Sequence, residues 1–294
     1  MNRYGVLRRL LIFLSTFFVL FMLVLPLFSI LVNSFRNGFI FYINAINTEY
    51  VVSALKLSCL VVVITVIVNT VFGIAAAWCI TRYDFFGKKM LITLADLPLS
   101  ISPVIAGLSL ILIYGRGGWM TPFINKINSM TGWDIKIVFA IPGVVLATIF
   151  VTIPLISREL ISVLENVGTD EEEAAALMGV SGFRIFFRIT LPHIKYALIY
   201  GILLCTARAM GEFGAVNAIS KIRGKTFTLP LEIDALYMSG TADSIVCAYA
   251  VSSILVVGSV VILIIKNLVF VLKEKKYASG AEKHNEEIRE DNCG

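Results

Sequence analysis

Charged and hydroxyl side chains inside apolar stretches are the residues of this sequence that could do chemistry. Arg208 and Glu212 lie one helical turn apart in one such stretch, and Asp96, Ser100 and Ser102 lie in another. A guanidinium presents a planar fork of donors that suits a compact oxyanion. Charges inside a membrane also commonly pair with each other. Arg208 could therefore line an anion pathway with Ser100 and Ser102 while Glu212 orients it, or Arg208 and Glu212 could form a purely structural ion pair.

Other chemistry is not supported by the residue patterns. His193 and His284 lack the H-E-x-x-H spacing of a zinc site, and the five cysteines form no short-spaced pair. Gly224-Lys225-Thr226 resembles the end of a P-loop, but Ile219 stands where that motif needs a glycine. The sequence therefore predicts that this chain is not an enzyme and that it holds no metal, nucleotide or other cofactor.

The composition places these residues in a membrane. Of the 294 residues, 58% are hydrophobic and 15% are charged, whereas soluble domains carry about 25% charged residues. The 25 basic residues outnumber the 20 acidic ones, but they cluster beside apolar runs, as residues that set membrane orientation do. This pattern excludes a soluble domain and argues against nucleic-acid binding.

Apolar runs of about the length that crosses a bilayer predict an all-α membrane protein with about six transmembrane helices. They form one transmembrane domain over residues 1–272, with approximate spans Leu10–Val32, Val51–Ile80, Met90–Ile113, Val138–Leu160, Tyr196–Val216 and Ser244–Leu272. Prolines in the third and fourth runs predict breaks or kinks. Asp96 favours a wet cavity beside the third run, because a carboxylate in lipid needs a partner or water.

The distribution of lysine and arginine predicts that both termini are cytoplasmic. The bias is modest, because the outer segments are also basic, above all Lys221-Ile222-Arg223-Gly224-Lys225-Thr226. That loop could be a solvated connector, or it could concentrate anions at the outer face. Residues 273–294 alternate charges without apolar periodicity and are expected to form a flexible cytoplasmic tail.

The segment of residues 165–192 lies between the fourth and fifth runs and predicts a short helix–turn–helix at the cytoplasmic face. Thr169 and Glu172 have capping-box spacing, and four acidic residues follow Thr169 directly. Alanines 174–176 should continue the helix, and Gly179 should end it. From these residues alone, a plain surface loop remains an equal alternative.

The spacing within this segment resembles the EAA signature of permease subunits of bacterial ABC importers. The matching residues are Glu173-Ala174-Ala175, Gly179, Ile189 and Leu191-Pro192. The resemblance implies the type I ABC importer permease fold and a coupling helix that docks in a groove of a cytoplasmic ATPase. It assigns that contact to Glu172, Glu173, Ala174, Ala175 and Gly179. A short helix with small apolar side chains suits such a groove.

Further motifs resemble the sulfate branch of these permeases and its W-type subunit, over roughly residues 51–272. They are Leu97–Gly107 in the third run, Val138–Gly143 and Phe150–Thr152 in the fourth, Ala207–Val216 in the fifth, and Ile222–Thr226 with Thr228–Leu231 after it. Residues 217–221 depart from the family pattern, which leaves the shape of the outer loop open.

This resemblance implies a permease subunit that moves sulfate, and also thiosulfate, across the cytoplasmic membrane of a prokaryote. The implied partners are a homologous T-type permease, two copies of an ATPase that bind ATP and Mg, an extracytoplasmic sulfate-binding protein, and membrane lipid. A molybdate or tungstate importer is the nearest alternative, since it shares the third- and fifth-run motifs. An ion-coupled secondary transporter is a more distant one, because no internal repeat is visible.

Overall fold

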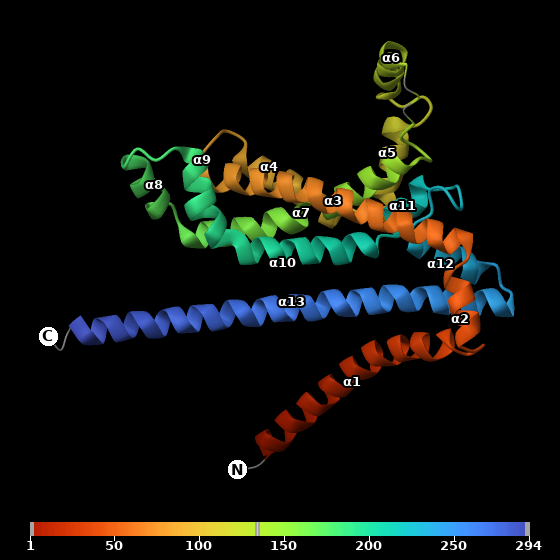
Figure 1. Cartoon of the computed structure of the whole chain (residues 1–294), viewed down its shortest axis with the longest axis horizontal. Coiled ribbons are helices and arrows are strands. Elements are labelled where there is room, and N and C mark those ends of the chain that lie inside the picture. The colour runs from red at the N-terminus through yellow and green to blue at the C-terminus, as the bar shows by residue number, and fades with distance from the viewer. Residues whose placement is uncertain (1–2, 133, 135, 292–294) are drawn as a thin grey trace.

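The computed structural model describes residues 3–132, 134 and 136–291, and these residues form helices joined by short connections (Figure 1). The order is α1 (Arg3–Ser34), α2 (Phe39–Ile46), α3 (Glu49–Arg82), α4 (Lys88–Ser100), α5 (Pro103–Tyr114), α6 (Thr121–Thr131), α7 (Ile141–Val167), α8 (Asp170–Leu177), α9 (Gly182–Ile185), the π-helical turn η1 (Phe186–Thr190), α10 (Leu191–Met210), α11 (Gly214–Ile219), α12 (Leu229–Met238) and α13 (Ala242–Asp291).

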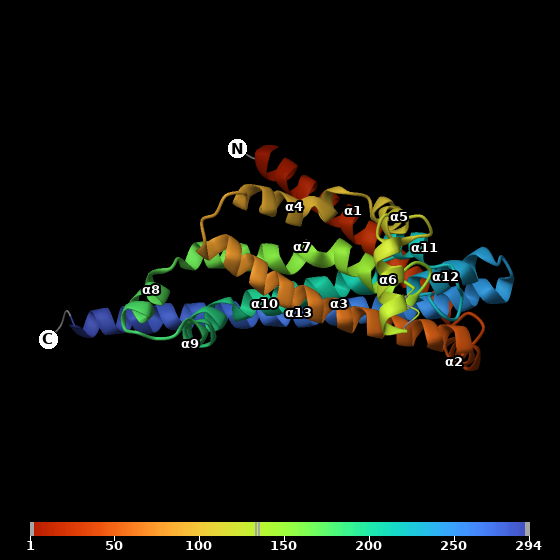
Figure 2. The ribbon, with the colours of Figure 1, turned by 90° about the horizontal axis from the view of Figure 1, so that it is seen from above.

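The predicted all-α fold with about six spans is confirmed. Within the described residues, five helices are long and apolar enough to cross a membrane, and the bent pair α4–α5 supplies a sixth crossing if it counts as one span. The long helices run side by side (Figure 1). The segment of α8, α9 and η1 lies at one end of the bundle, hereafter the α8 end, and α11 and α12 lie at the other, hereafter the α12 end (Figure 2).

The third span is broken, as its prolines predict. The helix direction bends by 110° between α4 and α5. Ser102 has the extended backbone of φ −58° and ψ 132°, and Pro103 is the first residue of α5. A residue before proline is disfavoured in the helical region, and proline itself suits the first helical position. The sequence Ser102-Pro103 therefore ends one helix and starts another in a new direction.

The predicted fifth span begins and ends earlier in the sequence than expected, and a second break follows it. α10 ends at Met210, and α11 begins at Gly214 after an interruption at Gly211. Gly214 packs against the third-span break, since a Cβ placed there would lie 3.0 Å from Pro103 Cβ. The two broken spans are therefore in direct contact.

Small residues bring the central helices α3, α7 and α10 close together. A Cβ placed on Gly73 of α3 would lie 2.8 Å from a side-chain methyl of Ile156, and one on Gly201 of α10 would lie 3.2 Å from Ile156 Cα. Ile156 of α7 is fully buried between them. Close approach over small residues is the usual way that spanning helices gain packing energy, because lipid tails are as apolar as leucine.

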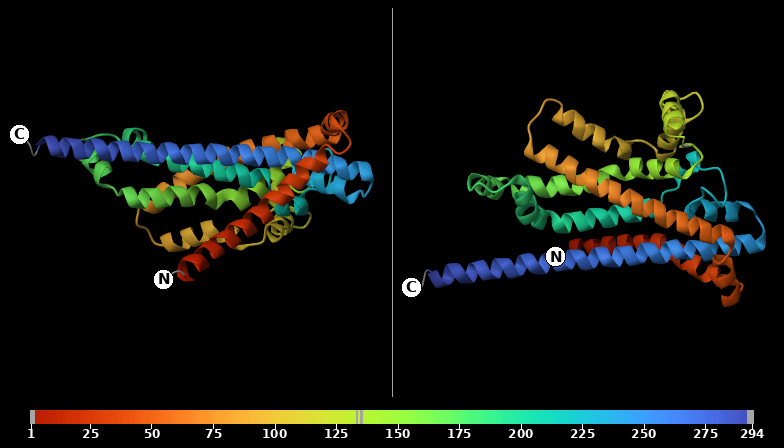
Figure 3. Two further views of the ribbon diagram at one scale, coloured as in Figure 1. Left: turned by 90° about the horizontal axis from the view of Figure 1, so that it is seen from below. Right: turned by 45° about the horizontal axis from the view of Figure 1, so that its top comes forward.

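Two terminal helices flank these three, and α13 packs on α3 and α12 through the buried Val251. α1 packs against α13 near α2 and then diverges from the bundle (Figures 1 and 3). No part of its most apolar window is buried within this chain. α13 continues as one helix to Asp291 and so includes residues 273–291, for which the sequence predicted a flexible cytoplasmic tail. Alanine, lysine and glutamate are strong helix formers, which favours a helix here.

Candidate functional site

The acidic helix α8 has Thr169 as its N-cap residue, as predicted, but the predicted capping box is wrong. The Thr169 side chain makes no cap bond to the backbone and instead donates its hydroxyl hydrogen bond to Glu173 Oε1 over 2.7 Å. Glu172, the expected capping partner, points elsewhere. All four acidic residues, Asp170 to Glu173, still lie in the first turn of α8, where the helix dipole favours negative charge.

Glu172 attaches α8 to the bundle through a bidentate ion pair with Arg82 at the end of α3. Arg82 Nε lies 2.8 Å from Glu172 Oε2, and Arg82 Nη2 lies 3.0 Å from Glu172 Oε1. The Thr190 hydroxyl donates a third bond to Glu172 Oε1 over 2.8 Å. The side chains of Arg82 and Glu172 are only 8% and 16% exposed. This partly buried, charge-assisted network ties α8, α3 and η1 together.

A second contact and a ring pair hold the same segment. His193 Nε2 lies 2.9 Å from Glu171 Oε2, and the rings of Trp78 and Phe186 pack with centroids 5.2 Å apart. η1 is a π-helical turn, a form that is rare and is frequently found at functional sites. The segment is therefore a built, anchored unit and not a loose surface loop.

Gly179 ends α8 with the hydrogen bonds of a Schellman motif. Its φ is +80°, its N–H donates to the Ala176 carbonyl over 2.9 Å, and the Val180 N–H donates to the Ala175 carbonyl over 3.2 Å. These bonds satisfy carbonyls that the helix end would leave unpaired. The left-handed backbone explains why a glycine stands at this position.

We expect Gly179→Ala to destabilise the protein by about 1 kcal/mol, because alanine resists the left-handed conformation. No atom lies within 4 Å of the position that a Cβ would occupy, so the penalty comes from the backbone and not from a clash. Thermal unfolding of the purified protein measures it.

The matched control for this change is Gly182→Ala. Gly182 also has open space around its Cβ position, but its φ is not positive. If both variants unfold at the same temperature, the left-handed residue does not hold the end of α8.

The five residues predicted for the ATPase contact divide into two groups. Glu173, Ala174 and Gly179 are exposed, whereas Glu172 is half-buried against Arg82 and Ala175 is 5% exposed. The exposed apolar tip of the segment comes from residues that the sequence analysis did not select: Leu177 is 91% exposed and Met178 is 77% exposed. Phe183 of α9 is also 77% exposed. The position of Leu177 and Met178 directly after the alanine run could have indicated this exposed apolar tip.

The predicted pathway residues lie on the two broken spans, which touch each other at Gly214 and Pro103. Ser100 ends α4, Ser102 precedes α5, and both are exposed. α5 packs on α11 so closely that a Cβ at Gly107 would collide with the Ala215 carbonyl. The third-span and fifth-span motifs therefore form one structural unit at the turn between helices.

Glu212 lies at the centre of this unit, and the predicted ion pair with Arg208 is present. Arg208 Nη2 lies 2.9 Å from Glu212 Oε2, and the Ala215 N–H donates to Glu212 Oε1 over 2.9 Å. The Glu212 side chain is 1% exposed, whereas the Arg208 side chain is 41% exposed. Glu212 therefore joins the end of α10 to the start of α11, while the guanidinium of Arg208 remains accessible from one side.

Asp96 has a partner that the sequence analysis missed. Arg158 of α7 places its Nε 2.9 Å from Asp96 Oδ1 of α4. The pair borders a cavity of about 240 Å³ between α4 and α7, whose lining includes Ser157, Ser162 and Glu165. The expected cavity beside Asp96 is therefore present. From the sequence, Arg158 was interpreted only as one of the basic residues that set the orientation of the chain in the membrane.

The basic loop after α11 is held in place by contacts of Arg223. Neither the solvated connector nor the anion-concentrating loop suggested by the sequence included these contacts. Arg223 Nη2 lies 2.6 Å from Oε1 of Glu232, whose side chain is fully buried, and the Arg223 guanidinium lies 4.8 Å from the centre of the Tyr50 ring. Hydrogen bonding to the Glu232 carboxylate raises the pKa of Arg223 above its ordinary value. Lys221 and Lys225 of this loop are exposed, and the Arg223 side chain remains 41% exposed despite these contacts.

The described residues include no cluster of three histidine, cysteine, aspartate or glutamate side chains that could hold a metal. Ile219 is a fully buried core residue of α11, so a phosphate-binding loop does not precede Gly224. The geometry provides a protruding apolar tip on an anchored helix at one end of the bundle, and a polar break between helices nearer the other end.

Comparison with known proteins identifies this architecture. Residues 69–271 match the model of the binding-protein-dependent transport system inner membrane component family. The chain belongs to this family. It is 41% identical over 262 residues to the sulfate transport system permease protein CysW of Synechocystis, which covers 89% of this chain and 92% of the relative. It is 34% identical over 206 residues to the permease protein CysT of Salmonella typhimurium, covering 70% and 72%.

A solved structure confirms the fold. The bacterial alginate ABC transporter, determined in complex with an alginate pentasaccharide-bound periplasmic protein, contains a chain that aligns with a TM-score of 0.70. The alignment covers 92% of this chain and 96% of that chain, at 18% sequence identity. The predicted ABC importer permease fold is therefore confirmed, and the family member described here is a multi-pass membrane protein.

Proposed function

We propose that this chain is the W-type permease subunit of an ATP-driven sulfate importer, which also carries thiosulfate. The observation that carries the proposal is the anchored helix α8 with its exposed tip of Leu177 and Met178. A solvent-exposed apolar tip on a rigid helix is the kind of surface that docks in a groove of a partner protein. The similarity to sulfate permeases supports the choice of anion.

The proposed orientation places the α8 end in the cytoplasm. The basic residues at that end include Arg82, Lys88 and Arg184, and positive charge favours the cytoplasmic side. α1 starts and α13 ends on the same side of the bundle (Figure 1). Both termini would then be cytoplasmic, in the cytoplasmic membrane of a prokaryote.

The partners follow from the function. A homologous T-type permease completes the pathway, since this chain is similar to both CysW and CysT proteins. The unburied apolar surface of α1 offers a face that the second permease or lipid covers. Two copies of a cytoplasmic ATPase bind ATP and Mg, and an extracytoplasmic sulfate-binding protein docks at the α12 end. This chain contributes no catalytic or nucleotide site of its own.

In the proposed mechanism, the two ATPases close when they bind ATP. Their closure moves the coupling segment of each permease subunit, which in this chain contains α8. The Arg82–Glu172 pair transmits that movement from α8 directly into α3, because it joins the two helices with two short hydrogen bonds. The pathway then opens to the outside, accepts sulfate from the binding protein and returns after hydrolysis. The permease responds as a rigid lever because its coupling helix is tied to the bundle.

The pathway needs weak, multiple contacts, because strong binding would prevent release. Ser100 and Ser102 offer hydroxyl groups at the break between α4 and α5, and Arg208 offers a half-exposed guanidinium. Glu212 does not face the anion in this account, since its side chain is buried against Arg208 and Ala215. It holds Arg208 in place.

Uptake of radiolabelled sulfate by cells that depend on this chain tests the proposal. We expect uptake to require the chain, the ATPase and the binding protein, and to be inhibited by excess thiosulfate more strongly than by molybdate. Inhibition by molybdate at far lower concentration than by thiosulfate would favour the molybdate alternative. Uptake without the ATPase would overturn the importer assignment.

A further inference from the structure

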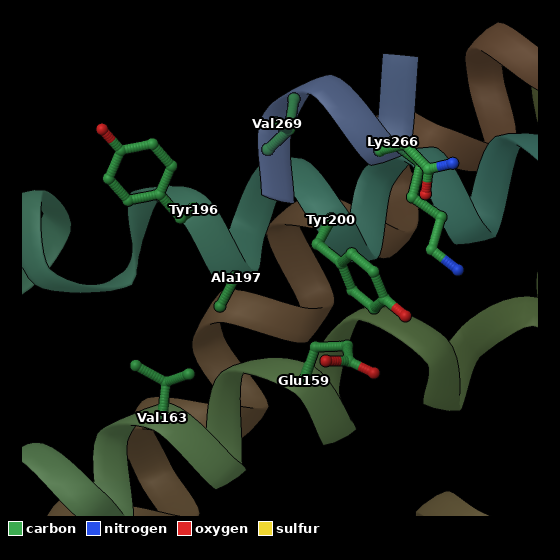
Figure 4. A pocket seen from close by; sticks show the side chains of 8 residues that line it. Glu159, Val163, Tyr196, Ala197, Tyr200, Lys266 and Val269 are labelled. Atoms are coloured by element: carbon green, nitrogen blue, oxygen red, sulfur yellow. The ribbon is translucent and has the colours of Figure 1, made fainter. Parts of the chain in front are cut away.

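A cavity of about 390 Å³ lies between α7, α10 and α13, away from the coupling segment and the broken spans. Its lining includes Glu159 of α7, Tyr200 of α10 and Lys266 of α13. In Figure 4, the polar ends of these three side chains converge on one side of the opening, and Val163 and Ala197 lie on the other. The cavity thus combines a charged corner with an apolar wall.

The cation in this cavity is held in a defined position. Lys266 Nζ lies 5.0 Å from the centroid of the Tyr200 ring, a cation–π distance. The Tyr200 hydroxyl extends toward the same corner (Figure 4). An ammonium and a phenol side by side provide donors for the oxygens of a phosphate or sulfate group.

The cavity lies within reach of the lipid headgroups at the α8 end. Lys266 lies six residues before Leu272, the last residue of the apolar run of α13, and six residues span about 9 Å of a helix. A lysine near the end of a spanning helix extends its ammonium toward the membrane surface. Tyr196, also in the lining, has the amphipathic ring that is enriched at this level.

Glu159 on the same lining distinguishes between possible occupants. A carboxylate beside Lys266 disfavours a bare dianion, but it suits a headgroup that carries a positive charge next to its phosphate. Its two oxygens accept several hydrogen bonds at once, so contact with an ammonium does not require Glu159 to lose another partner. The apolar wall of Val163, Ala197 and Val269 suits an acyl chain better than a hydrated anion.

We propose that this cavity binds phosphatidylethanolamine, with the phosphate on Lys266 and Tyr200 and the amine toward Glu159. The site is separate from the transport pathway. The inference depends on the chain spanning a membrane and not on which anion it transports, so it can fail while the proposed function stands.

Native mass spectrometry of the full-length protein, purified with its associated subunits, tests the proposal with added dioleoyl phosphatidylethanolamine, phosphatidylglycerol or phosphatidylcholine. We expect wild-type protein to retain phosphatidylethanolamine best. Lys266→Met should weaken that retention about tenfold, the effect of losing one charge-assisted hydrogen bond. Lys225→Met is the control, because it removes one lysine charge from the exposed loop after α11, and Lys225 does not line the cavity.

Two further variants separate the outcomes. Glu159→Gln should remove the preference for phosphatidylethanolamine over phosphatidylglycerol. Tyr200→Phe keeps the ring under Lys266 and removes only the hydroxyl, so it tests the site if Lys266→Met fails to assemble; it should weaken retention to a smaller degree. Equal retention of phosphatidylethanolamine by wild type and Lys266→Met would overturn the proposal. Loss of the bound lipid when millimolar sulfate is added would also overturn it.

Discussion

Replacing Glu172 with glutamine is expected to destabilise the protein by about 2–3 kcal/mol and to abolish most sulfate uptake. Arg82, whose side chain is 8% exposed, would lose its carboxylate partner, and removing one member of a buried pair leaves an uncompensated charge. Glutamine retains one acceptor oxygen, so the loss is smaller than the 3–5 kcal/mol typical of such removals. Thermal unfolding and radiolabelled uptake measure the two effects.

The matched control for Glu172 is its neighbour Glu173→Gln. Glu173 is exposed, and its side chain contacts the hydroxyl of Thr169, so we expect a change within about 0.5 kcal/mol. The double variant R82M/E172M should be more stable than Glu172→Gln, because apolar replacement of both partners removes the unpaired charge. Equal stability of Glu172→Gln and Glu173→Gln would contradict the anchoring role of the ion pair.

Replacing Glu212 with alanine is expected to have a similarly large effect, through the junction of α10 and α11. The change removes the acceptor of the Ala215 N–H and the partner of Arg208 from a site that is 1% exposed to solvent. Leaving a buried donor unpaired costs about 1–3 kcal/mol, and the cavity left by the side chain adds to this. We expect a lower unfolding temperature and weak uptake.

A double-mutant cycle separates the two roles of Glu212. Arg208→Met alone leaves the carboxylate buried with the Ala215 N–H, and Glu212→Gln alone keeps an acceptor for that N–H. Because the two side chains contact each other, R208M/E212Q should be less destabilised than the sum of the single variants. Additive losses would show that the ion pair does not couple α10 to α11.

The number and order of the spans could be predicted because each apolar run satisfies a length that the bilayer imposes. The break at Ser102-Pro103 could be predicted because proline constrains both itself and its neighbour. The end of α10 could not, since apolar residues continue beyond Met210 in Phe213, Ala215 and Val216. Its interruption depends on contact between Gly214 and Pro103 of another span, which no local pattern encodes.

The coupling segment was predictable in position but not in its internal geometry. Thr169 and Glu172 have the spacing of a capping box, and the local pattern favours that bond. The structure instead directs Glu172 to Arg82, 90 residues away in the sequence. An ion pair with a buried arginine outweighs a cap at an exposed helix end, and only the fold brings the two residues together. The pairing of Asp96 with Arg158 was missed for the same reason.

The central claim is that the tip of α8 contacts a separate ATPase, and site-specific photo-cross-linking tests it most directly. A photoreactive amino acid at Leu177, which is 91% exposed, should form an adduct with the ATPase in native membranes. The same probe at Met130, which is 79% exposed on α6, should not. Adducts of Leu177 with lipid alone, or none while uptake is intact, would contradict the account.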